Sequence, residues 1–264
     1  MHIINRKIKT IAAVAAVAAL SLAASCSDVS SKKLVKKGLY NCSERLRAAA
    51  GRMEKKNYAD AVRILEDIKF QCGGSPVMDS VYYYAALSQL RQKQYDEARA
   101  EFEALYGEFP RSPFVDEAHF RVAHIRYLRS LPSFRDQTET KEAMRLFNDY
   151  VDLYPNGAYA DSARALYAQS LNKLAEKELN NALFYRKQKE HNAALIYYRA
   201  VLSEYPESKF AAEAVVGMAE MLVVLQRDSE AAEEVGELDA AAFDDGLRAR
   251  IEAVRRKVVI NNGS

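Results

Sequence analysis

A short pattern of alanines and helix stops recurs along this chain and restricts its fold more than any other feature. Five alanines carry the pattern and lie 37, 45, 51 and 37 residues apart: Ala61, Ala98, Ala143, Ala194 and Ala231. After three of them an aromatic residue and a proline follow at the same offset: Phe109-Pro110, Tyr154-Pro155 and Tyr205-Pro206. Between alanine and stop, apolar residues such as Phe102 and Leu105 keep helical spacing with Ala98. Proline disfavours a helical conformation in the residue before it, so each segment should be a short helix with a defined end.

A small residue stands twelve positions before three of these alanines: Ala49, Ala86 and Ala219. Small residues at this spacing let two antiparallel helices approach closely, which is typical of tetratricopeptide repeats with a period of about 34 residues. One such hairpin cannot bury both of its faces, so it needs neighbouring copies. We therefore predict an all-α fold, a right-handed α-solenoid of about five TPR-like helical hairpins plus a C-terminal capping helix. The alternative is a generic alanine-rich helical bundle.

The stops also suggest where the repeats lie. The solenoid is expected over residues 34–241, with repeats at about 34–73, 79–110, 116–155, 161–206 and 212–239, and a capping helix and tail at 242–264. Asp79 is expected to cap the first helix of the second repeat. Residues 161–189 contain no proline or glycine, so the first helix of the fourth repeat should have about twice the normal length. The face of the last helix that can cover the end of the stack consists of Leu247, Ile251, Val254 and Val258.

The first 25 residues have the features of a secretory signal rather than of a folded segment. A basic start precedes an apolar stretch at 11–22 that is too short to span a bilayer. Small residues then lead directly to Cys26, which predicts a bacterial lipobox in which Cys26 is acylated, for example by palmitate, and becomes the new N-terminus. An ordinary signal-peptidase site is the alternative, because Ala23 and Ser25 also fit its small-x-small rule. Residues 26–33 would form a lipidated, polar tether.

Two further cysteines flank the turn that is expected near Asn57. Cys42 lies fifteen residues before this asparagine and Cys72 lies fifteen after it, so the two face each other in an antiparallel helix pair. Disulfides persist in an exported compartment. We predict a Cys42–Cys72 disulfide that links the two helices of the first hairpin; the alternative is a pair of unpaired buried cysteines.

The sequence offers little that could support catalysis. His119 and His124 are five residues apart, which does not match the spacing that places two metal ligands on one helix face. No Cys-x-x-Cys, phosphate-binding loop or Gly-x-Ser-x-Gly motif is present. Loss of residues 1–25 removes three basic residues and would change the net charge from +2 to −1, which argues against a nucleic-acid partner. We expect no catalytic residue, no metal, no cofactor and no enzymatic activity.

Binding of a protein segment is the better interpretation. Stacked hairpins line a concave face with the first helix of each pair. The residues expected on that face are Tyr83, Leu87, Arg91, Phe120, His124, Tyr127, Gln169 and Asn172. Tyrosine suits a peptide groove because it offers a large contact area with a polar tip. Tyr83 and Phe120 fit the core between repeats equally well.

Four stretches resemble a known family. They are FPRSPFVDEA (109–118), RDQTETKEAMRLFNDYVDLYPNGAYADSA (135–163), LAEKELNNALFYRK (174–187) and HNAALIYYRAVLSEYPES (191–208). With the lipoprotein signal and five repeats, the chain resembles the BamD family of outer-membrane protein assembly lipoproteins over about residues 30–235.

The resemblance implies a non-enzymatic protein held by its lipid at the periplasmic face of the outer membrane. Its C-terminal repeats would bind the POTRA domains of a BamA-like insertase, and its N-terminal repeats would engage unfolded outer-membrane β-barrel proteins. Two other hypotheses fit a periplasmic repeat protein of this kind. One is a different periplasmic TPR lipoprotein that acts as a scaffold in envelope or cell-division coordination, and the other is a periplasmic chaperone without an insertase partner.

Overall fold

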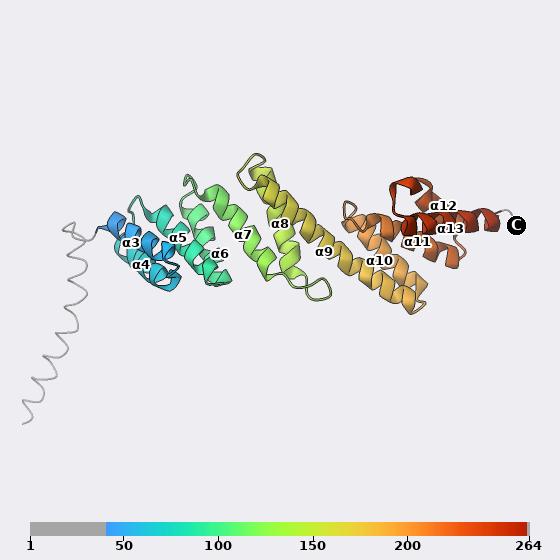
Figure 1. Ribbon diagram of the computed structural model, residues 1–264, viewed down its shortest axis with the longest axis horizontal. Helices are drawn as coiled ribbons and strands as arrows, with labels where there is room; N and C mark the ends of the chain where they lie inside the picture. The colour runs from blue at the N-terminus through green and yellow to red at the C-terminus, as the bar shows by residue number, and fades with distance from the viewer. Residues whose placement is uncertain (1–40, 263–264) are drawn as a thin grey trace, which may run out of the picture. The chain divides into compact units, whose positions relative to one another are not determined.

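A computed structural model describes residues 41–262 of the chain (Figure 1). The expected signal peptide, the acylated Cys26 and the tether lie outside these described residues. Every regular element between residues 41 and 262 is a helix, which confirms the all-α prediction. The chain divides into two compact units, Met1–Ala118 and His119–Ser264.

Within residues 41–262, five helical hairpins and one further helix follow one another in sequence. The described part of the first unit contains α3 (Cys42–Glu54), α4 (Tyr58–Gln71), α5 (Met78–Arg91), α6 (Tyr95–Glu108) and the start of α7 (Val115–Arg129). The second unit contains the rest of α7, then α8 (Thr138–Leu153), α9 (Ala160–Lys187), α10 (His191–Glu204), α11 (Ala211–Val224), α12 (Asp228–Gly236), a 3₁₀ turn (Ala240–Ala242) and α13 (Asp245–Asn262). The prediction of about five TPR-like hairpins in a helical solenoid is confirmed. The expected long helix is α9, which has 28 residues against 14 in its partner α10.

Four of the five hairpins turn in the same way. The residue at each turn has a left-handed conformation, with φ between 58° and 63°: Lys56, Lys93, Lys189 and Gln226. The next backbone N–H then donates to the carbonyl five residues earlier at 2.9–3.0 Å, in the pairs Asn57–Arg52, Gln94–Gln89, Glu190–Tyr185 and Arg227–Leu222. This hydrogen bond satisfies a carbonyl at the end of the first helix and reverses the chain, as in a Schellman motif. The third hairpin instead has a longer connection between its helices, an insertion at residues 130–137.

The connections between hairpins are also repeated. The carbonyl at the end of each second helix accepts a hydrogen bond from the N–H three residues later, in the pairs Cys72–Ser75, Phe109–Ser112, Tyr154–Gly157 and Tyr205–Ser208. In three of the four, proline follows the aromatic residue and prevents the helix from continuing. Four hairpins thus share one type of internal turn, and all four connections between hairpins share one hydrogen bond.

The prediction that Asp79 caps α5 is wrong. The helix begins one residue earlier, at Met78, and its N-cap residue Val77 makes no side-chain capping bond. The Asp79 carboxylate instead accepts hydrogen bonds from the Ser80 N–H at 2.6 Å and from the Ser112 hydroxyl at 2.8 Å. It therefore joins the start of α5 to the connection that follows α6.

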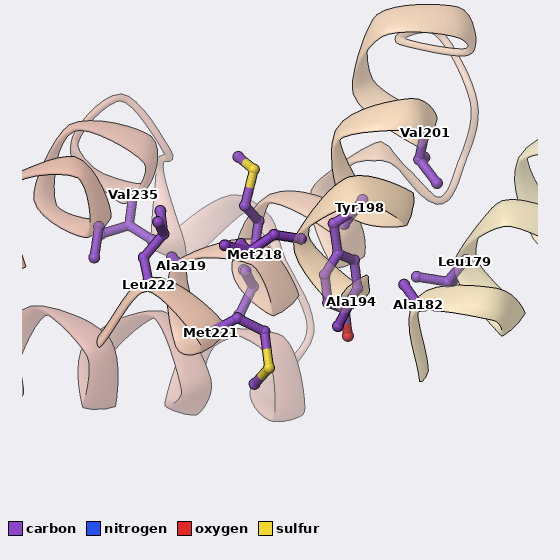
Figure 2. Close-up of a cluster of buried hydrophobic side chains, with 14 of the residues drawn as sticks. Leu179, Ala182, Ala194, Tyr198, Val201, Met218, Ala219, Met221, Leu222 and Val235 are labelled. Carbon is purple, nitrogen blue, oxygen red and sulfur yellow. The ribbon is translucent and has the colours of Figure 1, made fainter. Parts of the chain in front are cut away.

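The five alanines of the repeated pattern are all fully buried, as are Ala49, Ala86 and Ala219. In the second unit, the buried Tyr198 of α10 lies between α9 residues such as Ala182 and α11 residues such as Met218 (Figure 2). A Cβ atom added at Gly217 would lie 2.5 Å from the Tyr198 ring. A glycine is therefore needed there for α10 and α11 to pack at this distance.

The last helix, α13, packs on α11 and α12. Three of the four residues predicted to form its covering face are buried: Ile251, Val254 and Val258. Arg250 donates to Glu213 at 2.6 Å and to Glu220 at 2.7 Å, and Arg255 donates to the carbonyls of Val235 and Leu238. The helix is held by apolar burial and by these arginines together.

In the first hairpin, Cys42 and Cys72 form a disulfide with 6.2 Å between their Cα atoms and 30 residues of sequence separation. Both sulfurs belong to the apolar cluster of this hairpin, which includes Leu65 and Ile68. The cross-link thus joins the start of α3 to the end of α4.

Candidate partner-binding site

The described residues contain no group of three or more His, Cys, Asp or Glu side chains that could hold a metal ion. A pocket in the second unit is the better candidate for a functional site. It has a volume of about 420 Å³ and receives side chains from the first helix, or its entry, in each of the last three hairpins. Its lining residues are Tyr127 of α7, Pro132 and Ser133 of the insertion, Gln169, Asn172, Lys173 and Glu176 of α9, and Lys209 and Phe210 just before α11.

Two hydrogen bonds connect the segments that line this pocket. The Tyr127 hydroxyl donates to the Gln169 side-chain carbonyl at 2.8 Å. The backbone N–H of Lys209 donates to the Asn172 side-chain carbonyl at 2.9 Å. Tyr127, Gln169 and Asn172, which the sequence placed on one binding face, therefore lie together in the structure.

Gln137 anchors the wall formed by the insertion through several hydrogen bonds. The amide nitrogen of Gln137 donates to backbone carbonyls of the insertion, including Pro132 at 2.7 Å and Asp136 at 3.1 Å. Gln137 is only 3% exposed, so these bonds are protected from water. The same loop leaves Phe134 largely in solvent, with 76% of its surface exposed.

Two lysines that sequence reasoning missed give the pocket its charge. The Lys173 ammonium donates to the Ser130 hydroxyl at 2.7 Å and lies 5.4 Å from the centre of the Tyr127 ring. Burial lowers the pKa of Lys173, and the nearby Glu176 carboxylate opposes this shift. The Lys209 ammonium lies 4.9 Å from the centre of the Phe210 ring. Lys173 could have been found from its position next to Asn172, whereas Lys209 lies in a connection whose place depends on hairpin packing.

The remaining predicted groove residues do not join this pocket. Tyr83, Leu87 and Arg91 follow one face of α5 in the first unit. The Tyr83 hydroxyl donates to Glu117 at 2.7 Å, and its ring stacks on Phe114 with 4.1 Å between centroids. Leu87 is half-buried and Arg91 is exposed.

The prediction that Phe120 lines a groove is wrong. Its side chain is only 5% exposed and stacks on Tyr159 at 4.7 Å, within the cluster that also contains Phe147 and Tyr150. The neighbouring His124 is half-buried, and burial followed by the charge of Arg121 lowers its pKa. Phe120 is therefore part of the core.

Comparison with known protein families matches residues 41–238 to the family described as "YfiO: Outer membrane lipoprotein". The chain belongs to this family. It is similar to the outer membrane protein assembly factor BamD of Caulobacter vibrioides, with 24% identity over 182 residues that cover 69% of this chain and 60% of the relative. Its identity to BamD of Haemophilus influenzae is 25% over 226 residues, covering 81% of this chain and 83% of the relative. The chain spans only about 60% of the length of the first curated relatives that it matches.

Solved structures of repeat proteins align with much of the chain but only loosely. A thermophilic TPR protein of Thermus thermophilus has 17% identity and a TM-score of 0.36, with coverage of 81% of this chain and 98% of that protein. Separately, none of the helices within residues 41–262 has the length and apolar character needed to cross a bilayer.

Proposed function

We propose that this chain is a non-enzymatic scaffold of the machinery that assembles β-barrel proteins in the outer membrane. The observation that carries the proposal is its membership of the YfiO family over residues 41–238, together with its similarity to several proteins named outer membrane protein assembly factor BamD. Repeated hairpins support a scaffold because they present long, preformed surfaces to extended segments.

In this proposal the chain is anchored by an acyl group on Cys26 to the periplasmic face of the outer membrane. The second unit binds the POTRA region of a BamA-like insertase, and the first unit binds unfolded barrel proteins. The boundary after Ala118 supports a division of labour, because it separates α5, with its half-buried Leu87 and exposed Arg91, from the pocket of the second unit.

Depletion of the protein tests the role as a whole. Many outer-membrane β-barrel proteins should decrease together, because they share one assembly route, while inner-membrane proteins keep their levels. Quantitative proteomics of separated membranes measures both groups. Unchanged barrel levels would contradict the assignment and favour a scaffold for another envelope process.

The division of labour is tested with a photo-crosslinking amino acid at Arg91 or at Gln169, which are both exposed. Crosslinks from position 91 should capture unfolded barrel proteins, and crosslinks from position 169 should capture a POTRA-containing protein. The reverse pattern, or the same partner at both positions, would refute the division.

The anchor is tested with Cys26→Ala, using the adjacent Ser27→Ala as the matched control. The first variant should release the protein from membranes because no thiol remains to be acylated, and the second should stay bound. Retention of Cys26→Ala on membranes would rule out anchoring by this cysteine.

A further inference from the structure

The turn of the third hairpin carries an exposed apolar tip. Three large apolar side chains lie between positions 128 and 134, and each has a large exposed fraction: 45% for Leu128, 43% for Leu131 and 76% for Phe134. The loop that bears the last two extends beyond the ends of α7 and α8 (Figure 1). Phe134 does not line the pocket of the second unit, so that site does not account for its exposure.

The backbone of this loop is already hydrogen-bonded within the protein. The amide nitrogen of the buried Gln137 lies 2.7–3.4 Å from the carbonyl oxygens of Leu131, Pro132, Arg135 and Asp136. The Arg135 N–H also donates to the Pro132 carbonyl at 3.0 Å, and proline has no N–H of its own to satisfy. Unsatisfied backbone groups are what normally keeps a loop away from hydrocarbon. Because these carbonyls have partners in the protein, the tip can leave water without losing them.

The charge around the tip is positive on balance. Arg135 is exposed in the loop, and Lys177 of α9 donates to the Arg135 backbone carbonyl at 3.4 Å. Arg126 and Arg129 share a single carboxylate, that of Glu139. Basic side chains on and beside the loop therefore outnumber acidic ones; the basic set is Arg126, Arg129, Arg135, Lys173 and Lys177, and the acidic set is Asp136, Glu139 and Glu176. Apolar side chains next to basic ones are typical of segments that bind anionic membrane surfaces.

The small area of the tip favours lipid over a protein partner. A phenylalanine side chain offers at most about 150–250 Å², and the two leucines are each less than half exposed. Together they fall well below the roughly 800 Å² per partner of a stable protein interface. A fluid bilayer needs no matching shape, so a short apolar tip is sufficient to enter it. We propose that the tip formed by Leu128, Leu131 and Phe134 inserts into the headgroup region of an anionic phospholipid bilayer, as a contact separate from the acyl anchor.

Tryptophan fluorescence can locate the tip because the chain contains no tryptophan. Phe134→Trp places the only indole at the tip. Phe70→Trp is the matched control, because Phe70 of α4 in the first unit has a similar exposed fraction of 72%. Both variants of the full protein are mixed with vesicles of phosphatidylcholine and phosphatidylglycerol, and the emission of the vesicle-bound fraction is recorded. A second set of vesicles carries bromine on the acyl chains, which quenches an indole that lies in the bilayer.

The emission of Phe134→Trp should move to shorter wavelength on the vesicles and should lose intensity when the acyl chains carry bromine. The emission of Phe70→Trp should stay that of an indole in water on both sets. Adding Arg135→Gln to Phe134→Trp should reduce the shift, and so should vesicles of phosphatidylcholine alone, because both remove attraction between opposite charges. All three substituted positions are exposed, so the core stays unchanged.

Emission typical of water at position 134, or equal quenching at positions 70 and 134, would overturn the proposal. An equal shift on neutral and anionic vesicles would refute the part assigned to the basic side chains. A photo-crosslinking amino acid at position 134 tests the other occupant in cells, and its capture of one protein of defined mass would replace lipid by a protein partner. The inference relies on the proposed function only for a membrane beside the protein. Because the vesicle measurement does not involve barrel levels, its failure and the failure of the proposed function are distinguishable.

Discussion

The disulfide of the first hairpin makes a quantitative prediction about local stability. Cys42 and Cys72 close a loop with a sequence separation of 30 residues. In the chain-entropy description, a cross-link over this length stabilises the folded hairpin by about 3.6 kcal/mol, because it restricts the unfolded chain. Reduction of the wild-type protein isolates this effect, since it opens the covalent loop and leaves every side chain in place.

Hydrogen exchange followed by mass spectrometry measures the change helix by helix. In a repeat protein each hairpin depends mainly on its neighbours, so the loss should be local. Amides of α3 and α4 that exchange only when the hairpin opens should exchange about 400-fold faster after reduction, which is about 3.6 kcal/mol expressed as a ratio of rates. Amides of α11, which has no disulfide, should keep their rates.

Two results would refute this reasoning. One is an acceleration in α3 and α4 of less than about tenfold, which would mean that the cross-link contributes under about 1.4 kcal/mol. The other is equal acceleration in α11, which would show that reduction acts on the whole chain. Thiol labelling of the unreduced, denatured protein is the preliminary control, and it should detect no free thiol at Cys42 or Cys72.

Three further predictions follow from the packing, the turns and the burial of a histidine. Gly217→Ala should lower the free energy of unfolding, because the added Cβ atom would lie 2.5 Å from the Tyr198 ring. Overpacking of this kind costs roughly 1–3 kcal/mol, whereas the better helix propensity of alanine returns only about 1 kcal/mol. A higher melting temperature would contradict this prediction. Lys93→Gly should raise the free energy of unfolding by up to about 1 kcal/mol, because φ is 60° at this turn and glycine adopts this conformation without strain. Lys55→Gly is the control, because φ is −79° there, and it should lower the free energy of unfolding in the same urea titration. Burial lowers the pKa of His124 below 6.5, so the folded protein binds this proton less readily than the unfolded chain. The stabilising contribution of the neutral imidazole should therefore be fully present above pH 6.5 and should be lost as the pH falls through the lowered pKa. His124→Gln should reduce the slope of the unfolding free energy against pH, and an unchanged slope would exclude this contribution.

The helices and their ends follow from local sequence. Alanine at fixed intervals, apolar residues at helical spacing and proline after an aromatic residue act within a single helix or hairpin, so a linear pattern reveals them. The 28 residues of α9 follow from the same local rule, because nothing in residues 161–189 breaks a helix. Asp79 shows the limit even of local reasoning, because Ser112, 33 residues away, competes for its carboxylate.

The site depends on contacts between hairpins, and only the tertiary structure decides these. Phe120 and Tyr127 both occupy α7 at helical spacing, yet Phe120 is covered by Tyr159 while Tyr127 reaches Gln169 in a pocket. Lys209 belongs to a connection, and its place beside Asn172 comes from the packing of α9, α10 and α11. Periodicity identifies which residues share a helix face, but the neighbour that covers each of them is determined by how separate hairpins pack.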